Sequence, residues 1–343
     1  MIKIGLNIGE IVPRTAIEFK ELKGKVVVVD AFNTLYQFLS TIRQPDGTPL
    51  MDSKGRTTSH LSGLFYRNVS LLQEGMKLIY VFDGKPPELK GLTHDNRTKV
   101  KEVAKEKYEE AKQKEDTEMM GKYARQLARL TTEMIEESKD LLEAMGIVVV
   151  QAPSEGESQA ADLAKKKNYY VGSQDYDSLL FGAPRLIQNL TLARKRKTVS
   201  GMVYISPEII ELDKVLNTLQ ISIDQLICLG ILCGTDYNPG GIRGIGQKRA
   251  LEIVKKLKQP VLIFDSVKEM ISKLDKPFDW KEIFELFHKP HVDKDVEIEW
   301  PKTNEERIKD ILVNDHEFNE ERVENALDRL RKGKEESQQR TLF

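Results

Sequence analysis

The sequence predicts an α/β protein with a mostly parallel central sheet that is flanked by helices on both faces. Four short, nearly continuous apolar runs lie at residues 25–30, 77–83, 146–151 and 169–175, and longer helical stretches separate them. Such runs are typical of parallel strands, because the connecting helices bury both faces of a parallel sheet. We therefore expect the four runs to be strands of one sheet.

Three of these runs end in an aspartate, namely Asp30, Asp83 and Asp175. Ligands of open parallel sheets bind beyond the carboxyl ends of the strands. Simpler interpretations exist, since Asp83 with Gly84 is typical of a hairpin turn and Asp175 of a loop after a strand. The strand ends are nevertheless the edge at which a functional site is expected.

The composition allows a large folded core but does not point to a partner. The chain has 343 residues, of which 40% are hydrophobic, enough for one large or two ordinary domains. Its 53 basic and 54 acidic residues leave a formal net charge of -1. The overall charge therefore gives no support for nucleic-acid binding, and only a local basic patch could.

The two cysteines and the apolar runs bear on the compartment. Cys228 and Cys233 lack the paired spacing of a zinc or redox motif, so we expect reduced core residues. No apolar run is as long as a membrane span, and Asn7 and Glu10 interrupt the start of the chain before a signal-peptide core forms. We expect a soluble cytoplasmic protein with no membrane association.

A long polar segment, residues 88–135, lies between the second and third predicted strands. Its charges are mixed in sign and many have helical i,i+4 spacing, while its apolar residues are too sparse for a full core face. Two interpretations stay open: a solvated helical hairpin, or a mobile helical element that contacts a charged ligand. Six of its eleven basic residues lie in its first half, which slightly favours the second interpretation.

Residues 227–257 have the pattern of a helix-hairpin-helix. An apolar helix precedes a glycine-rich turn, and Gln247 opens the second helix. Gly244 and Gly246 would let backbone N–H groups approach a phosphate, and Lys248 adds a cation near the helix N-terminus. A plain packing turn is the alternative, but the lysine favours binding to a phosphate backbone.

Two further carboxylates, Glu155 and Glu157, begin an alanine-rich helical stretch. Ser154 and Glu157 have the spacing of a capping box, which would explain Glu157 without any ligand. Gathering many carboxylates at one edge would be unfavourable unless cations neutralised them. The candidates at strand ends or element junctions are Asp30, Asp83, Glu155, Glu157, Asp175, Asp177 and Asp236.

The chemistry of this set indicates the metal. Oxygen ligands without histidine or cysteine favour Mg²⁺ or Mn²⁺ over zinc. Seven carboxylates exceed what one octahedral ion needs, whereas two ions about 3.5–4 Å apart would suit the hydrolysis of a phosphodiester. Glu155 and Glu157 share such a site only at the helix end, so capping and metal binding are compatible there.

Several long motifs carry a resemblance to one family. They are DAFNTLYQFL, RQPDGTPLMDSKGRTTSHLSGLFYR, YVFDGKPPELK, APSEGE, SQDYDSL and CGTDYNPGGIRGIGQKRA. Together they are similar to the structure-specific 5′ nucleases of the XPG/Rad2 type, and most of all to the flap endonucleases of archaea and eukaryotes. The resemblance extends from about residue 22 to about residue 330.

The resemblance implies roles in catalysis. It makes the seven carboxylates ligands of two Mg²⁺ ions, for which Mn²⁺ would substitute, and it assigns Lys85 and Arg97 to the scissile phosphate. Cations there stabilise the charge that develops on the phosphate oxygens. The polar segment 88–135 corresponds to the helical arch through which a single-stranded 5′ flap passes.

The resemblance also implies DNA contacts. Tyr36 would stack on a base beside the cleaved bond, although a half-buried helix tyrosine is the simpler interpretation. Thr58 and Arg322 match positions that hold a one-nucleotide 3′ flap, and a K⁺ ion would assist the glycine turn. The implied DNA-binding residues are Tyr36, Arg43, Thr58, Gly244, Gly246, Lys248 and Arg322.

The chain departs from the family pattern at both ends. It begins Met1-Ile2-Lys3-Ile4-Gly5, where family members usually begin Met-Gly. Gln339, Leu342 and Phe343 supply only the first part of the family's sliding-clamp motif. We therefore expect weakened binding to the clamp (PCNA).

The sequence thus predicts a monomeric 5′ flap endonuclease that cleaves DNA near the base of a 5′ flap by two-metal-ion hydrolysis. A 5′–3′ exonuclease activity on nicked DNA and roles in Okazaki-fragment processing and DNA repair are implied with it. Rival hypotheses are a 5′ exonuclease or junction resolvase, a ribonuclease, and a catalytically silent junction-binding scaffold that recruits a clamp.

The same resemblance predicts the regions of the chain. They are an N-terminal nuclease region (1–105), the arch (88–135), an internal nuclease region (139–230), the helix-hairpin-helix (227–260), a C-terminal helical region (261–334) and a clamp-binding tail (335–343).

Overall fold

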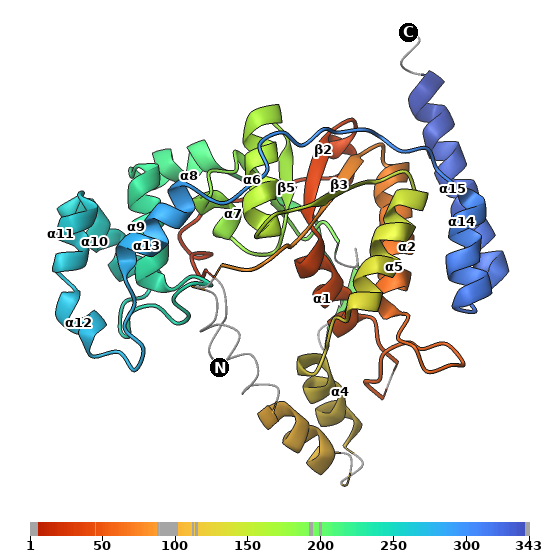
Figure 1. Ribbon diagram of the computed structural model, residues 1–343, viewed down its shortest axis with the longest axis horizontal. Helices are drawn as coiled ribbons and strands as arrows, with labels where there is room; N and C mark the ends of the chain where they lie inside the picture. The colour runs from red at the N-terminus through yellow and green to blue at the C-terminus, as the bar shows by residue number, and fades with distance from the viewer. Residues whose placement is uncertain are drawn as a thin grey trace. The chain divides into compact units, whose positions relative to one another are not determined.

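A computed structural model describes residues 6–44, 46–87, 89, 102–111, 113, 116–191, 195–198 and 201–339 (Figure 1). The chain divides into two compact units, each assembled from three segments. The first unit comprises Met1–Ile17, Asp83–Asn96 and Gln151–Asp295, and the second comprises Glu18–Phe82, Arg97–Val150 and Val296–Phe343.

The second unit contains strands β2 (Val26–Asp30), β3 (Lys77–Phe82) and β4 (Val148–Gln151), adjacent in that order. β2 and β3 are parallel, and Val28 pairs with Ile79. Successive residues of a strand point to opposite faces, and successive residues of both strands are almost fully buried. Both faces of this part of the sheet are therefore covered, as the unbroken apolar runs predict.

Helices of the second unit pack around these strands. α1 (Ala31–Thr41) contacts β2 and β3, and α2 (Ser59–Gln73) packs against α1. α5 (Thr132–Ala144) and α15 (Glu320–Gln339) in turn pack on α2. The C-terminal helix α15 thus belongs to the same packed unit as β2 and β3.

The first unit contains strands in the order β1 (Thr15–Ala16), β9 (Glu208–Glu211), β6 (Arg185–Gln188) and β5 (Tyr170–Gly172). β5 and β6 are parallel, whereas β6–β9 and β9–β1 are antiparallel.

Helices of the first unit connect these strands to the helix-hairpin-helix. α6 (Gly156–Lys167) packs on β5 and on α7 (Asp177–Leu180), and α7 packs on α9 (Ile223–Cys233). α9 also contacts α10 (Gln247–Leu257), α11 (Pro260–Asp265) and α13 (Trp280–His288). Further elements among the described residues are η1 (Phe19–Leu22), α4 (Thr117–Gln126), β7 (Lys195–Thr198), β8 (Gly201–Tyr204), α8 (Leu212–Leu219), α12 (Lys268–Ser272), α14 (Glu305–Lys309) and the π-helix η3 (Asp310–Asp315).

The predicted mixed α/β class, with mostly parallel strands flanked by helices, is confirmed. The four predicted strands are β2, β3, β4 and β5, each somewhat shorter than expected. The parallel strand β6, the antiparallel strands β1 and β9 and the two-stranded sheet of β7 and β8 lie outside the prediction. They are two to four residues long and lie outside the apolar runs by which the other strands were predicted.

The polar segment 88–135 is mostly helical where the structure describes it. Residues 102–111 form one helix, and α4 begins after Asp116, whose carboxylate accepts a hydrogen bond from Met119 N at 3.0 Å. α4 packs against α1, and Thr131 caps the start of α5. The predicted helical character of this segment is confirmed, while its contact with a ligand stays a prediction.

Within the described ranges, no single helix is long and apolar enough to cross a membrane, and only the bent pair α8 and α9 meets that requirement jointly.

Candidate active site

The turn after β3 makes a close backbone contact that fixes Asp83. Gly84 N donates to Ser154 O at 2.5 Å, and a Cβ on Gly84 would lie 2.3 Å from Ala152 O. Only a glycine fits this approach. Asp83 Oδ1 then accepts a hydrogen bond from Gly156 N at 2.7 Å.

That hydrogen bond corrects the predicted capping box. α6 begins at Gly156 with Glu155, not Ser154, at the N-cap position, and no side chain of the N-cap residue caps the helix. The first free N–H group of the helix is bound by Asp83, which is distant in the sequence. A carboxylate is favoured there by the helix dipole, so the local Ser154–Glu157 pattern is not used.

The two glutamates point to different partners. Glu155 is 6% exposed and accepts a hydrogen bond from the hydroxyl of Tyr237. Glu157 Oε1 accepts from Ser178 N at 3.0 Å, at the start of α7. The two carboxylates therefore connect α6 to the turn after α9 and to the loop after β5.

The loop after β5 carries the two aspartates of the SQDYDS motif. Asp175 N donates to Ser173 Oγ at 3.2 Å, which shapes the loop, and Asp177 is the first residue of α7 and is 5% exposed. The hydroxyl of Tyr176, between them, accepts from Arg14 Nη2 at 3.1 Å.

Asp236 lies in the turn that follows α9. Asn238 fixes this turn, because its Oδ1 accepts from Thr235 N at 3.1 Å and its Nδ2 donates to Ile231 O at 2.7 Å. Asp236 is half-buried, and its neighbour Tyr237 is fully packed. Six of the seven candidate carboxylates therefore lie in the first unit, on loops and helix starts that hydrogen bonds connect.

Asp30 is the candidate of the second unit. It is 8% exposed at the end of β2, and its Oδ1 accepts from Asn33 N at 3.0 Å as the N-cap of α1. The strand end thus presents a carboxylate as predicted.

Within the part of the chain that the structure describes, no group of three or more His, Cys, Asp or Glu side chains has the arrangement of a metal site. The carboxylates instead accept protein hydrogen bonds, from Asn33 N, Gly156 N, Ser178 N and the Tyr237 hydroxyl. The donor chemistry fits Mg²⁺ or Mn²⁺, because the set is made of carboxylate oxygens alone.

Lys85 is exposed and lines a cavity of about 530 Å³ beside Glu155. Pro153, Ser154 and residues of α13 complete the lining. A cation from the turn after β3 thus shares a cavity with a candidate metal ligand. Arg97, the second predicted catalytic cation, lies outside the described residues.

The region predicted as a helix-hairpin-helix contains a helix, a glycine-containing turn and a second helix. α10 begins after Gly246, and Gly244 has a φ of +85°, a conformation that favours glycine. Lys248 is exposed, and its Nζ is 3.9 Å from Glu10 Oε2, while Gln247 Oε1 accepts from Glu10 N at 3.1 Å. The N-terminal segment therefore contacts the start of α10, whereas Met1 to Gly5 lie outside the described residues.

The other predicted DNA contacts are spread over the second unit. Tyr36 on α1 is 37% exposed, and Arg43 Nη1 donates to Gly47 O at 2.7 Å in the loop that follows. Thr58 is buried directly before α2, and Arg322 is exposed in the first turn of α15.

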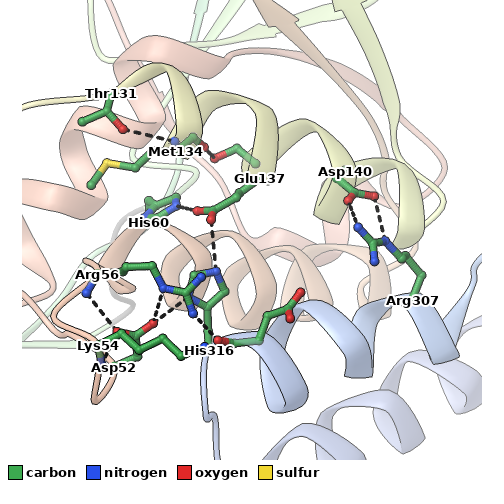
Figure 2. A network of polar contacts seen from close by, with 12 residues as sticks. Asp52, Lys54, Arg56, His60, Thr131, Met134, Glu137, Asp140, Arg307 and His316 are labelled. Carbon is green, nitrogen blue, oxygen red and sulfur yellow. Dashed lines mark hydrogen bonds and ion pairs between the residues drawn. The ribbon is translucent and has the colours of Figure 1, made fainter.

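A polar network joins the segments that carry Thr58 and Arg322 (Figure 2). Asp52 accepts from Arg56 Nε at 2.7 Å, and its Oδ2 is 3.2 Å from Nδ1 of His316. Nε2 of His316 is 3.2 Å from Oε1 of Glu137 on α5, and His60 Nε2 is 3.4 Å from Oε2 of the same carboxylate. Both His316 contacts are hydrogen bonds when the ring carries two protons.

The network shifts the pKa values of its acids. Hydrogen bonds from His316 and His60 lower the pKa of Glu137 to about 2. Burial would raise the pKa of Asp52, but hydrogen bonds from the backbone and side chain of Arg56 outweigh it and lower that pKa. The charged forms are therefore the stable ones in this folded unit.

The clamp-binding residues are described only in part. α15 ends at Gln339, and Leu342 and Phe343 lie outside the described residues. Cys228 and Cys233 are free thiols on α9, and burial raises the pKa of both to about 12, which fits the predicted reduced core residues.

Comparison with known proteins decides the family. The XPG N-terminal domain matches residues 8–104, and the XPG I-region matches residues 146–236. The chain is 52% identical over 335 residues to flap endonuclease 1 of Hyperthermus butylicus, covering 96% of this chain and 95% of that protein. It is 51% identical over 342 residues to flap endonuclease 1 of Pyrococcus furiosus, covering 99% and 98%. The chain belongs to the flap endonuclease family.

Solved structures agree with this membership. The flap endonuclease-1 of Methanococcus jannaschii has a TM-score of 0.75 and 42% identity, covering 96% of this chain and 98% of that one. The catalytic core of Rad2 in complex with a DNA substrate shares the fold, with a TM-score of 0.66 at 21% identity. Nucleases of this flap endonuclease family depend on divalent metals.

The sequence did not predict several residues whose side chains contact residues far away in the chain. The hydroxyl of Tyr237 reaches Glu155, 82 residues away, and His316 reaches Asp52, 264 residues away. Gln159, fully buried on α6, exchanges two hydrogen bonds with the backbone of Asp293 at 2.8 and 2.7 Å. For Gln159, the one signal in the sequence is a glutamine among the alanines of a predicted helix.

Proposed function

We propose that this chain is a structure-specific 5′ flap endonuclease that hydrolyses one DNA phosphodiester near the base of a 5′ flap. A 5′–3′ exonuclease activity on nicked DNA, in Okazaki-fragment processing and DNA repair, belongs to the same proposal. One observation carries it: the chain aligns over nearly its whole length with flap endonucleases 1, at about half identity.

Two Mg²⁺ ions are the proposed cofactors, with Mn²⁺ as a substitute. Asp30, Asp83, Glu155, Glu157, Asp175, Asp177 and Asp236 would hold them. The bound ions would supply Lewis-acid stabilisation of the phosphate oxygens and of the departing oxygen. Support comes from the donor chemistry and from the divalent-metal dependence of the family.

The chain itself would orient the substrate and stabilise charge. Lys85 is exposed at the mouth of a cavity that Glu155 also lines, so its ammonium group would reach a phosphate oxygen close to the ligands. Arg97 would add a second cation. Tyr36, a tyrosine exposed on α1, would stack on the base beside the scissile bond.

Recognition would be of DNA shape and backbone. Gly244, Gly246 and Lys248 would bind phosphates of the duplex, with a K⁺ ion at the glycine turn. Arg43, Thr58 and Arg322 would bind the remaining strands, the last two around a one-nucleotide 3′ flap. Binding should weaken steeply with salt even though the net charge is -1, because local phosphate contacts release counterions.

The proposed protein partner is the sliding clamp PCNA. Gln339, Leu342 and Phe343 would supply a shortened clamp motif, so the contact would be weaker than that of a full motif. We propose that the chain acts as a monomer on chromosomal DNA.

A panel of end-labelled DNA substrates tests the function. The expected result is Mg²⁺-dependent incision at the base of a double flap, leaving 5′-phosphate and 3′-hydroxyl ends, with slower removal of nucleotides from a nick. Preferred, symmetric cutting of a four-way junction would identify a resolvase instead. Binding of flap DNA without cleavage in Mg²⁺ or Mn²⁺ would leave a clamp-recruiting scaffold.

A further inference from the structure

The hydroxyl of Tyr237 donates a hydrogen bond to Oε2 of Glu155 inside the first unit. Tyr237 is 3% exposed and lies in the turn that also carries Asp236, one residue earlier. Glu155 is buried at the N-cap position of α6. The contact therefore joins two elements that each carry candidate metal ligands, and none of the predicted catalytic roles includes it.

The ring of Tyr237 also packs against an aromatic neighbour. Phe287 on α13 packs edge-on against it, with ring centroids 5.4 Å apart and an interplanar angle of 75°. Phe181, at the end of α7, packs on Phe287 at 4.8 Å. A buried aromatic ring with such neighbours keeps one orientation, so the direction of the hydroxyl is fixed by packing.

The backbone of Tyr237 is fixed as well. Its N–H donates to Thr235 Oγ1 at 3.2 Å, and Asn238 Oδ1 accepts from that hydroxyl at 2.8 Å. Asn238 Nδ2 anchors the turn to Ile231 O on α9. These hydrogen bonds restrict the conformation of the turn, and this turn holds the Tyr237 hydroxyl beside Glu155.

We propose that Tyr237 is a positioning residue that orients the Glu155 carboxylate for a divalent cation. The inference rests on the proposed metal role of Glu155. A donor bound to one carboxylate oxygen fixes the plane of the group and so the direction of the lone pairs on both oxygens. Hydrogen bonds of this kind to a metal ligand change metal affinity by about 10–100-fold when removed.

A phenol is suited to this role because it is neutral. An ammonium or guanidinium group at the same place would neutralise the carboxylate and compete with the metal ion for it. The phenol gives Oε2 of the buried carboxylate a hydrogen bond while leaving the charge of the group for the cation. Because Tyr237 follows Asp236 directly, the same rigid turn would set the positions of two ligands.

The test is Tyr237→Phe in the full-length chain, which removes the hydroxyl and keeps the ring that packs on Phe287. Mn²⁺ binding is measured by isothermal titration calorimetry without DNA, and the Mg²⁺ concentration for half-maximal flap cleavage is measured separately. We expect Mn²⁺ affinity to fall by about tenfold and the half-maximal Mg²⁺ concentration to rise correspondingly. KM for flap DNA should stay unchanged at saturating Mg²⁺.

The matched control is Tyr80→Phe in the second unit. The hydroxyl of Tyr80 is also buried and donates to Asn68 Oδ1 at 2.9 Å, but it contacts no candidate ligand. Its loss should lower the unfolding free energy without changing Mn²⁺ affinity. An equal effect of both variants on Mn²⁺ affinity would mean a general loss of stability and would overturn the proposal.

A second variant, Phe287→Leu, keeps the Tyr237 hydroxyl and the Glu155 carboxylate and loosens only the packing of the Tyr237 ring. It should weaken Mn²⁺ binding in the same direction by a smaller factor. Wild-type affinity in both Tyr237→Phe and Phe287→Leu overturns the positioning role while leaving the nuclease proposal intact. A wild type that binds no Mn²⁺ overturns both.

Discussion

The carboxylate of Asp83 accepts a hydrogen bond from the backbone nitrogen of Gly156 at 2.7 Å. Within the first unit, this contact joins the turn that begins at Asp83 to the first residue of α6, the helix that carries Glu157 and follows Glu155. It also puts an anion at the positive end of the helix dipole. Asp83, one of the proposed metal ligands, therefore also caps the N-terminus of α6.

Because Asp83 has both roles, Asp83→Asn should separate them. The amide keeps an acceptor for Gly156 N but loses the charge that a metal ion needs. We expect flap cleavage to fall by about a hundredfold, while the unfolding free energy changes by less than about 1 kcal/mol. Single-turnover cleavage and urea unfolding measure the two quantities.

Asp279→Asn is the matched control, because Asp279 caps α13 by accepting from Lys281 N at 2.8 Å and belongs to no candidate site. Cleavage should stay at the wild-type rate. A rate loss as large as that of Asp83→Asn would show that capping alone explains the effect.

Gly84→Ala should damage the same turn through the backbone. The new Cβ would lie 2.3 Å from Ala152 O, so the turn must separate from the residues before α6. We expect the unfolding free energy to fall by about 1–3 kcal/mol, the usual cost of overpacking. Gly246→Ala, where a Cβ meets nothing within 4 Å, should lower stability less, because only the N-cap preference for glycine over alanine is lost. Equal unfolding midpoints for the two variants would contradict the close approach.

The Glu137 network should make stability depend on pH in one direction. The pKa of Glu137 is lowered from 4.5 to about 2 in the folded chain, so its contribution is fully present above about pH 4.5. It is lost as pH falls toward 2. Glu137→Gln should therefore destabilise the chain at pH 7, and the difference from wild type should shrink below pH 4.5.

Glu136→Gln is the control on the same helix. Glu136 is well exposed and pairs with Lys139 at 2.8 Å, and such pairs contribute about 0–1 kcal/mol. Urea unfolding of the three proteins from pH 7 to pH 3 measures the differences. A Glu137→Gln effect that stays constant over this range would contradict the lowered pKa.

Lys248→Ala should weaken DNA binding without changing the fold. Its ion pair with Glu10, at 3.9 Å, is highly exposed and adds little stability. Loss of one phosphate contact should reduce the slope of log affinity against log salt by about 1. Lys255→Ala, in the last turn of the same helix, is the control and should keep the wild-type slope. Identical slopes for both variants would remove Lys248 from the phosphate contacts.

The strands and the helix-hairpin-helix were predictable from sequence because their signals are local. Each buried strand, such as Val26–Asp30, is a continuous apolar run, and the glycine turn before Gln247 breaks two helical patterns. The start of α6 was not predictable in the same way. Ser154 and Glu157 satisfy a local capping rule, but the hydrogen bond is made by Asp83, which only the tertiary fold brings near.

The hydrogen-bond partners of the candidate carboxylates could not be predicted from the sequence either. Nothing near Tyr237 in the chain indicates Glu155 as its acceptor, and the same holds for His316 with Asp52 and Glu137. Residue types, motif spacing and the family resemblance single out seven carboxylates as metal ligands, and that role stays a prediction. Packing decides which neutral or cationic groups hold those carboxylates in place.

The most direct test of the central claim compares wild type with Asp175→Ala on an end-labelled double-flap DNA. Cleavage with Mg²⁺ and DNA binding are measured in parallel. The account predicts incision at the flap base by wild type and a loss of about a hundredfold to a thousandfold in the variant, with binding largely retained. Equal cleavage by both proteins, or binding by wild type with no cleavage, would contradict it.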